Sequence, residues 1–177
     1  MTVNFSSAEA FERNIGLISP AEQKTLRDSL VVIAGCGGVG GLHAHTCARL
    51  GIGRFRITDA DTFSAPNINR QIGATAHTIG VKKVQVTAEM IRSINPDASV
   101  EVSDGLISAD NAAQFVSGAD LVIDSVDFFA LSARRQKIVS ARIACARVLD
   151  FSMLRRSLLA GRCRQIQKNK KRQFFSA

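Results

Sequence analysis

The residues with the clearest chemical potential are the glycines of one short segment, Gly35-Cys36-Gly37-Gly38-Val39-Gly40. The segment has the pattern G-x-G-x-x-G, follows a run of apolar, mostly β-branched residues and opens a stretch that favours a helix. Glycines in that setting allow a tight turn, and they let backbone amides approach a phosphate at the positive end of the helix. A tight turn that binds nothing is the alternative. The pattern predicts a nucleotide-binding loop and leaves the nucleotide open.

An acidic residue follows where a nucleotide-binding fold would use one. Asp59 lies 24 residues after Gly35, at the end of a second strand-like segment, where a carboxylate would take ribose hydroxyls. The alternative is an ordinary acid at a strand end. Together the glycine loop and Asp59 fit an NAD-dependent oxidoreductase and an ATP-using enzyme equally well.

A polar, charged stretch comes next that a dinucleotide-binding fold does not need. It runs through Asp59-Ala60-Asp61 and Pro66-Asn67-Ile68-Asn69-Arg70-Gln71, and Lys83 follows Gly80. Fixed cations beside a phosphate-binding turn suit a polyphosphate whose charge grows during the reaction, whereas hydride transfer has little use for them. Taken singly, Arg70 and Lys83 could equally be solvated surface charges.

In this order the segments resemble the ubiquitin-activating-enzyme-like adenylyltransferases of the ThiF, MoeB and HesA type. Seven ordered elements between about Arg13 and Ala144 carry the resemblance, which makes it far more specific than a lone glycine loop. They are Arg13-Asn14-Ile15, Gly35-x-Gly-Gly-x-Gly40, Asp59-x-Asp61, Asn67-x-x-Arg70-Gln71, Gly80-x-x-Lys83, Asn95-Pro96 and Asp124-x-x-Asp127.

The resemblance implies ATP and Mg²⁺ as cofactors and assigns nucleotide-binding positions. The loop glycines would surround the ATP phosphates, Asp59 would hold the ribose, and Asp61 and Asn67 would order the loop around the nucleotide, with Gln71 beside them. The matching loop glycines are Gly35, Gly37, Gly38 and Gly40.

The resemblance also implies the catalytic groups. Arg70 and Lys83 would hold the phosphates, and Asp127 would bind Mg²⁺. Arg13 matches an arginine that enters the neighbouring subunit's site, which implies a homodimer; a helix-end cation is the alternative. No zinc site is evident in the sequence, because the four cysteines form no C-x-x-C pair.

The implied reaction is carboxylate activation. The C-terminal carboxylate of a ubiquitin-like or sulfur-carrier protein, or of a peptide, would attack the α-phosphate of ATP, releasing pyrophosphate and leaving an acyl-adenylate. Mg²⁺ and the cations Arg70, Lys83 and Arg13 would screen the repulsion between the two anions.

The elements that must position these residues alternate along the chain. Ser19-Pro20-Ala21-Glu22 predicts a helix start, and the apolar run at 30–34 is typical of a strand covered on both faces. Strands are expected at 30–34, 54–58, 99–103 and 121–124, and helices from about 20 to 28, 38 to 50, 80 to 93, 108 to 115 and 129 to 144. This alternation predicts an α/β fold with a doubly wound, Rossmann-like, mostly parallel sheet, helices on both faces and a ligand crevice at the carboxyl ends of the strands.

Length and charge divide the chain into a body and a tail. A chain of 177 residues with 46% apolar side chains is sized for one core, and no apolar run could span a membrane or act as a signal peptide, so we expect a soluble cytoplasmic protein without a membrane partner. Residues 1–150, with an N-terminal helical segment at 1–29, hold 15 basic and 15 acidic residues, so the whole net charge of +8 lies in residues 151–177. The body gives no sign of nucleic-acid binding.

Residues 151–177 allow three interpretations. A shifted reading frame or truncation would explain the abrupt change, because the family's further strands and paired cysteines are not visible after about Ala144. The tail could instead be disordered, or it could bind a nucleic acid or another anionic surface. Phe128 also stands where the family usually has asparagine after Asp127. A non-catalytic nucleotide-binding fragment therefore stays open beside the adenylyltransferase and the NAD-dependent oxidoreductase.

Overall fold

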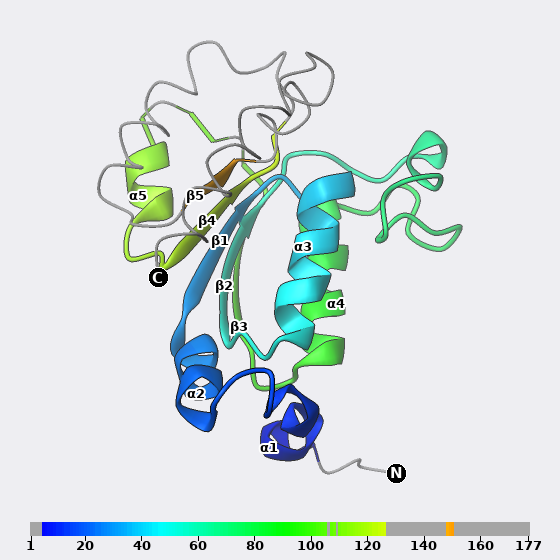
Figure 1. Cartoon of the computed structure of the whole chain (residues 1–177). Coiled ribbons are helices and arrows are strands. Elements are labelled where there is room, and N and C mark those ends of the chain that lie inside the picture. The colour runs from blue at the N-terminus through cyan, green and yellow to red at the C-terminus, as the bar shows by residue number, and fades with distance from the viewer. Residues whose placement is uncertain (1–4, 106, 109, 127–147, 151–177) are drawn as a thin grey trace, which may run out of the picture.

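The computed structural model describes residues 5–105, 107–108, 110–126 and 148–150 of the chain. Helices and strands alternate through this part, as the sequence predicts (Figure 1). The elements are α1 (Ser7–Ala10), the 3-10 turn η1 (Glu12–Asn14), α2 (Pro20–Asp28), β1 (Leu30–Ala34), α3 (Gly38–Arg49), β2 (Arg54–Thr58), the 3-10 turn η2 (Ala65–Asn67), α4 (Lys83–Ile94), β3 (Ser99–Ser103), α5 (Ala112–Val116), β4 (Leu121–Asp124) and β5 (Val148–Asp150).

The strands form one five-stranded sheet in the order β3-β2-β1-β4-β5, and every pairing is parallel. The chain winds outward from β1 to β3 and then returns to the other side of β1 for β4, so the order reverses between β1 and β4. This confirms the doubly wound α/β fold, and ligands of such sheets bind beyond the carboxyl ends of the strands at the reversal. The three-residue strand β5 was not predicted.

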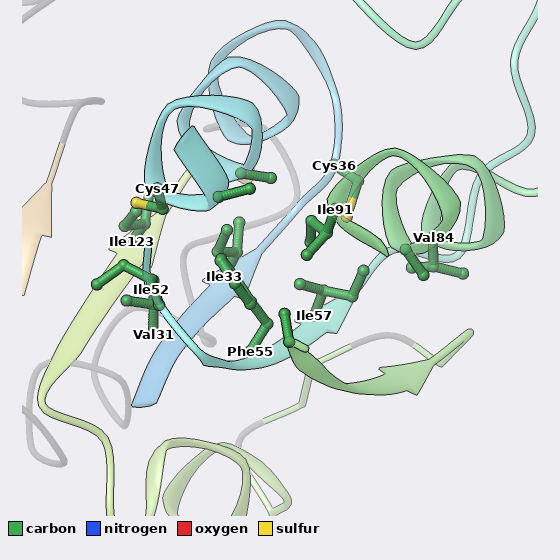
Figure 2. Packing of buried hydrophobic residues seen from close by; sticks show 14 residues of the cluster. Val31, Ile33, Cys36, Cys47, Ile52, Phe55, Ile57, Val84, Ile91 and Ile123 are labelled. Carbon is green, nitrogen blue, oxygen red and sulfur yellow. The ribbon is translucent and has the colours of Figure 1, made fainter. Parts of the chain in front are cut away.

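Strand β1 has no polar residue because it is buried in the core on both faces of the sheet. Its five side chains are all buried and point alternately to the two faces of the sheet. Val31 and Ile33 pack with side chains of α3 and α4 on one face (Figure 2). Leu30 and Val32 pack on the other face, where Val116 of α5 contributes. A strand covered on both faces is what the continuous apolar run predicts.

Helix starts are where the sequence predictions differ from the structure. The start of α2 is as predicted, with a capping box between Ser19 and Glu22. Helix α4, by contrast, starts at Lys83 and not near Gly80. Gly80 has a φ of +83° and its amide donates to the carbonyl of Phe63, so the chain is still in a turn there.

The start of α5 is also later than predicted. We expected a helix from Ser108, and the structure has it from Ala112. The side-chain amide oxygen of Asn111 accepts the amide of Ser108, and the hydroxyl of Ser108 accepts the amide of Asp110, so local side chains satisfy the backbone in a turn instead.

Two of the fold predictions lie outside the described residues: the helix at 129–144 and the nature of the tail at 151–177. Within the described part of the chain, no helix has the length and apolar character needed to cross a membrane.

Arg56 of β2 connects strand β3 with the end of helix α5. Its Nε donates to Oε2 of Glu101 on β3 at 2.6 Å, and its Nη1 donates to the carbonyls of Phe115 and Ser117 at 2.9 Å each. These carbonyls lie at the end of α5, so the guanidinium ties that helix to the sheet. The hydrogen bond from Arg56 lowers the pKa of Glu101 below its usual value.

Replacing Arg56 with methionine should lower the free energy of unfolding by about 2 kcal/mol, because hydrogen bonds to a charged group are lost. Arg54→Met is the matched control on the same strand, since Arg54 is exposed, and it should change stability by less than about 0.5 kcal/mol. Urea denaturation measures both. Because the pKa of Glu101 is lower in the folded protein, its contribution is present at neutral pH and lost as pH falls through that lowered value, so the Arg56→Met deficit should shrink in acid. Equal stability of the two variants would contradict this role.

Candidate functional site

The glycine loop, residues 35–40, lies at the carboxyl end of β1, where the strand order reverses (Figure 1). Gly35 has a φ of +91°, which glycine adopts without strain, and its amide donates to the carbonyl of Thr58 at 2.8 Å. Helix α3 starts directly after the turn, and its N-cap Gly37 provides no side-chain cap. The first amides of α3 are therefore available to an anion.

Gly40 is fixed by close packing. A Cβ at this position would lie 1.8 Å from the carbonyl oxygen of Gly35 and 2.4 Å from the hydroxyl of Ser125. Ser125 follows β4 and lies within hydrogen-bond distance of the carbonyls of Ala34 (2.8 Å) and Gly35 (2.9 Å). Ser125 was not predicted from the sequence, although its place directly after Asp124 in the Asp-x-x-Asp element was a signal.

Asp59 is placed against the glycine loop. Its Oδ2 accepts the amide of Cys36 at 2.7 Å, and its Oδ1 accepts the amide of Asp61 at 2.8 Å. The carboxylate thus joins the glycine loop to the polar loop, residues 59–82. A carboxylate has about four acceptor positions, so these two bonds leave capacity for the ribose hydroxyls predicted from the sequence.

Lys83 is the first residue of α4, and its side chain is only 9% exposed. Its Nζ lies 2.9 Å from Oδ2 of Asp61, whose side chain is 70% exposed. The pKa of the Cys36 thiol, within the glycine loop, depends on the groups around it. Burial raises its pKa to about 12, with a further rise from the Asp59 carboxylate and opposite effects from the Thr87 hydroxyl and the Lys83 ammonium. Hydrogen bonds from Lys83 to Asp61, from Asp61 to Asp59 and from Cys36 to Asp59 link the ammonium to the glycine loop.

The side chains of Asn67 and Arg70 make their hydrogen bonds within the polar loop. Asn67 orders a turn by accepting from the amide and hydroxyl of Ser64. Arg70 is exposed, and its Nη1 donates to the carbonyl of Pro66 at 2.8 Å and to Asn69 at 3.0 Å. The two hydrogen bonds of the Arg70 side chain are therefore within the polar loop and not to the glycine loop.

Gln71 is buried beside the glycine loop. It is 8% exposed, and its amide lies 3.7 to 3.9 Å from the position of a Cβ on Gly37, while the carbonyl of Arg70 is 3.3 Å from that of Gly38. Its Oε1 has no hydrogen-bond partner among the residues that the structure describes. The structure thus brings Gln71 and the backbone of Arg70 to the N-terminal end of α3.

Arg13 lies at the other end of α3. Its neighbour Asn14 donates to the carbonyl of Leu50, directly after the helix, and Gln23 of α2 donates to the same oxygen. Helix α3 has 12 residues and is about 18 Å long, so Arg13 is far from the glycine loop of its own chain (Figure 1).

The magnesium prediction is not tested, because Asp127 lies outside the described residues. Among the residues that are described, no three His, Cys, Asp or Glu side chains are grouped as metal ligands. His43 and Cys47 of α3, four residues apart, therefore have no third such ligand within that part of the chain.

The model of the ThiF family matches residues 11–145, about three-quarters of the chain and all of the site just described. The chain belongs to the ThiF family. This confirms the resemblance drawn from the seven sequence elements.

Curated relatives of this ThiF-family chain differ in what their names say they act on. The tRNA threonylcarbamoyladenosine dehydratase of Escherichia coli K12 is 43% identical over 101 residues, which are 56% of this chain and 38% of the relative. The SAMP-activating enzyme E1 of Haloferax volcanii is 29% identical over 131 residues, 73% of this chain and 48% of the relative. The chain thus spans less than half the length of either relative.

Solved structures agree with the family. The Escherichia coli tRNA N6-threonylcarbamoyladenosine dehydratase TcdA in complex with ATP superposes with a TM-score of 0.77 at 30% identity, covering 85% of this chain and 61% of that one. Escherichia coli MccB in complex with ATP superposes with a TM-score of 0.64 at 28% identity, covering 69% of this chain and 39% of that one. Each of these neighbours was solved with the nucleotide bound.

Gly40→Ala should be strongly destabilising, because the new methyl group would meet the backbone of Gly35. We expect a loss of about 3 kcal/mol in the free energy of unfolding, measured by urea denaturation. Gly105→Ala is the matched control: its Cβ would meet only the Ser103 hydroxyl at 3.6 Å, an ordinary contact, and it should cost less than about 0.5 kcal/mol. A Gly40→Ala protein as stable as the control would contradict the close packing of α3 on the glycine turn.

Proposed function

We propose that this chain carries the ATP-binding site of an adenylyltransferase that activates a carboxylate. The observation that carries the proposal is the link of the nearly buried Lys83 to the glycine loop through Asp61 and Asp59. A dinucleotide-binding loop and an acid would suit NAD equally well, but a nearly buried ammonium beside the loop suits a polyphosphate. Family membership and the ATP complexes of two structural neighbours support the same choice.

The reaction follows from the charges. A carboxylate oxygen attacks the α-phosphate of ATP, the bond from that phosphorus to the bridging oxygen of pyrophosphate breaks, and an acyl-adenylate remains. The uncapped amides of α3, Lys83 and Arg70 would stabilise the charge on the phosphates. Mg²⁺, held by Asp127, would supply further neutralisation of the phosphates.

The distance of Arg13 from its own glycine loop supports a homodimer. An arginine at the far end of α3 can act on the phosphates only from a second copy of the chain, whose Arg13 would have to reach across the subunit boundary. This is the arrangement that the family resemblance implies.

Two carboxylate donors fit the relatives. The C-terminus of a ubiquitin-like or sulfur-carrier protein, or of a peptide, is the first, supported by the SAMP-activating enzyme, which aligns over 73% of this chain. The threonylcarbamoyl group of a tRNA nucleoside is the second, favoured by the higher identity of 43% to the tRNA dehydratase. Threonine joined through its amine keeps a free carboxylate, and removing water from a carboxylate requires its activation.

Calorimetric titration tests the nucleotide. The chain should bind ATP in the presence of Mg²⁺ and should not bind NAD. Arg70→Ala should weaken ATP binding at least about tenfold, because charged hydrogen bonds to phosphate are lost. Arg54→Ala, an exposed arginine at the opposite end of β2, is the control and should leave the affinity unchanged.

Other outcomes of the titration would decide against the proposal. Preferential binding of NAD would identify an oxidoreductase. Binding of neither nucleotide by a folded chain would identify a fragment that has lost the site.

Pyrophosphate release identifies the carboxylate donor once ATP binding is established. Release that depends on a carrier protein ending in a free carboxylate supports the first donor, and amidation of that terminus should abolish it. Release that depends on tRNA bearing threonylcarbamoyladenosine, and not on tRNA lacking that group, supports the second. Release with neither would leave binding without turnover and contradict the proposed activity of this chain.

A further inference from the structure

Lys83 is in a position that disfavours an ammonium. It is the first residue of α4, where the helix dipole repels cations, and its side chain is only 9% exposed. The carboxylate of Asp61, 2.9 Å from Nζ, is the one hydrogen-bond acceptor that the described residues offer it. The bond to the Asp61 carboxylate offsets the unfavourable position of the Lys83 ammonium.

Asp61 is itself held by the backbone. Its carbonyl accepts the amide of Lys83 at 3.0 Å, and its amide donates to Asp59 at 2.8 Å. The next residues, Thr62 and Lys82, form an antiparallel bridge. The main chain around Asp61 is thus fixed on both sides, and its carboxylate lies directly opposite the start of α4.

The same bonds lead to the glycine loop. Asp59, which holds the amide of Asp61, also holds the amide of Cys36 within the loop. The Lys83 ammonium bonds to Asp61, so these contacts link the ammonium to the loop as well.

The Lys83 ammonium has more hydrogen-bond donors than Asp61 uses. It carries three N–H groups, and Asp61 takes one of them. Two donors are left for phosphate oxygens, so Lys83 can bind a nucleotide without leaving Asp61.

We propose that Asp61 is a positioning residue for Lys83: it holds the ammonium at the glycine loop so that polyphosphate binds a cation already in place. This inference rests on the proposed ATP site and adds to it a role for an exposed acid that touches no phosphate. The opposite view makes Asp61 a competitor that occupies the ammonium in place of a phosphate. The backbone bonds on both sides of Asp61 favour positioning, because they hold its main chain opposite the start of α4 before any nucleotide binds.

A double-mutant cycle tests the proposal. Asp61→Asn, Lys83→Met and the double variant are titrated with Mg²⁺-ATP and with adenosine, which has no phosphate. Asp61→Asn should weaken ATP binding about tenfold and leave adenosine binding unchanged. In the Lys83→Met background it should have no further effect, because Asp61 acts through the ammonium. Asp97→Asn, an exposed aspartate beyond the other end of α4, is the control and should match the wild type.

Two results of the cycle would overturn the proposal. Tighter ATP binding by Asp61→Asn would make Asp61 a competitor. Additive losses in the double variant would mean that Asp61 acts on the nucleotide without Lys83.

A second measurement works without nucleotide. Acylation of lysines by an amine-reactive ester, followed by mass spectrometry, should label Lys83 slowly in the wild type and several-fold faster in Asp61→Asn, relative to the exposed Lys24 as internal reference. An unchanged relative rate would overturn the positioning role. Absence of ATP binding by the wild type would overturn the proposed function instead, and the labelling would still decide whether Asp61 holds Lys83.

Discussion

The carboxylate of Asp59 is the point on which the site depends. One of its oxygens binds the amide of Cys36 in the glycine loop, and the other binds the amide of Asp61 in the polar loop. Two segments separated by more than twenty residues are thereby joined at one group. The parallel pairing of β1 and β2 brings the glycine loop and the polar loop to the same edge of the sheet, and Asp59 adds the direct bonds between them. Asp59, which the sequence predicts to hold a ribose, thus also links the two loops that form the site.

The sheet explains why the link forms where it does. β1 is buried on both faces and lies between β2 and β4, so the turn after it meets the ends of both neighbours. The amide of Gly35 donates to the carbonyl of Thr58 at the end of β2, and the hydroxyl of Ser125, after β4, donates to the carbonyl of Gly35. Gly40 then lets α3 approach so closely that no side chain fits between helix and turn. The amides of α3 are presented at a place that three strands hold rigid.

Sequence patterns predicted what depends on local residues. The four longer strands begin and end at the predicted residues, because apolar or alternating runs next to glycines and acids mark them clearly. The starts of α4 and α5 differ, because they depend on bonds from Gly80 to Phe63 and between Ser108 and Asn111 that a periodicity does not contain. β5 was missed because three residues give no periodicity. In the site, the sequence placed Asp59, Asp61 and Lys83 in one motif set, but their pairing needs the bridge between Thr62 and Lys82, which is tertiary structure.

The two cations predicted to hold phosphate differ in what binding requires of them. Lys83 is nearly buried and already fixed by Asp61, so most of its conformational entropy is lost on folding and not on binding. Arg70 is exposed and bonds to Pro66 and Asn69 of its own loop through Nη1 alone, so it would have to reorient to bring its other donors to a phosphate. In the proposed reaction a preorganised ammonium and an adaptable guanidinium would divide the work: the first would give the triphosphate a fixed anchor, and the second would follow charge as it shifts from the bound triphosphate to the leaving pyrophosphate. On this proposal Lys83 would contribute mainly to affinity, and Arg70 would be the cation best able to respond to the transition state.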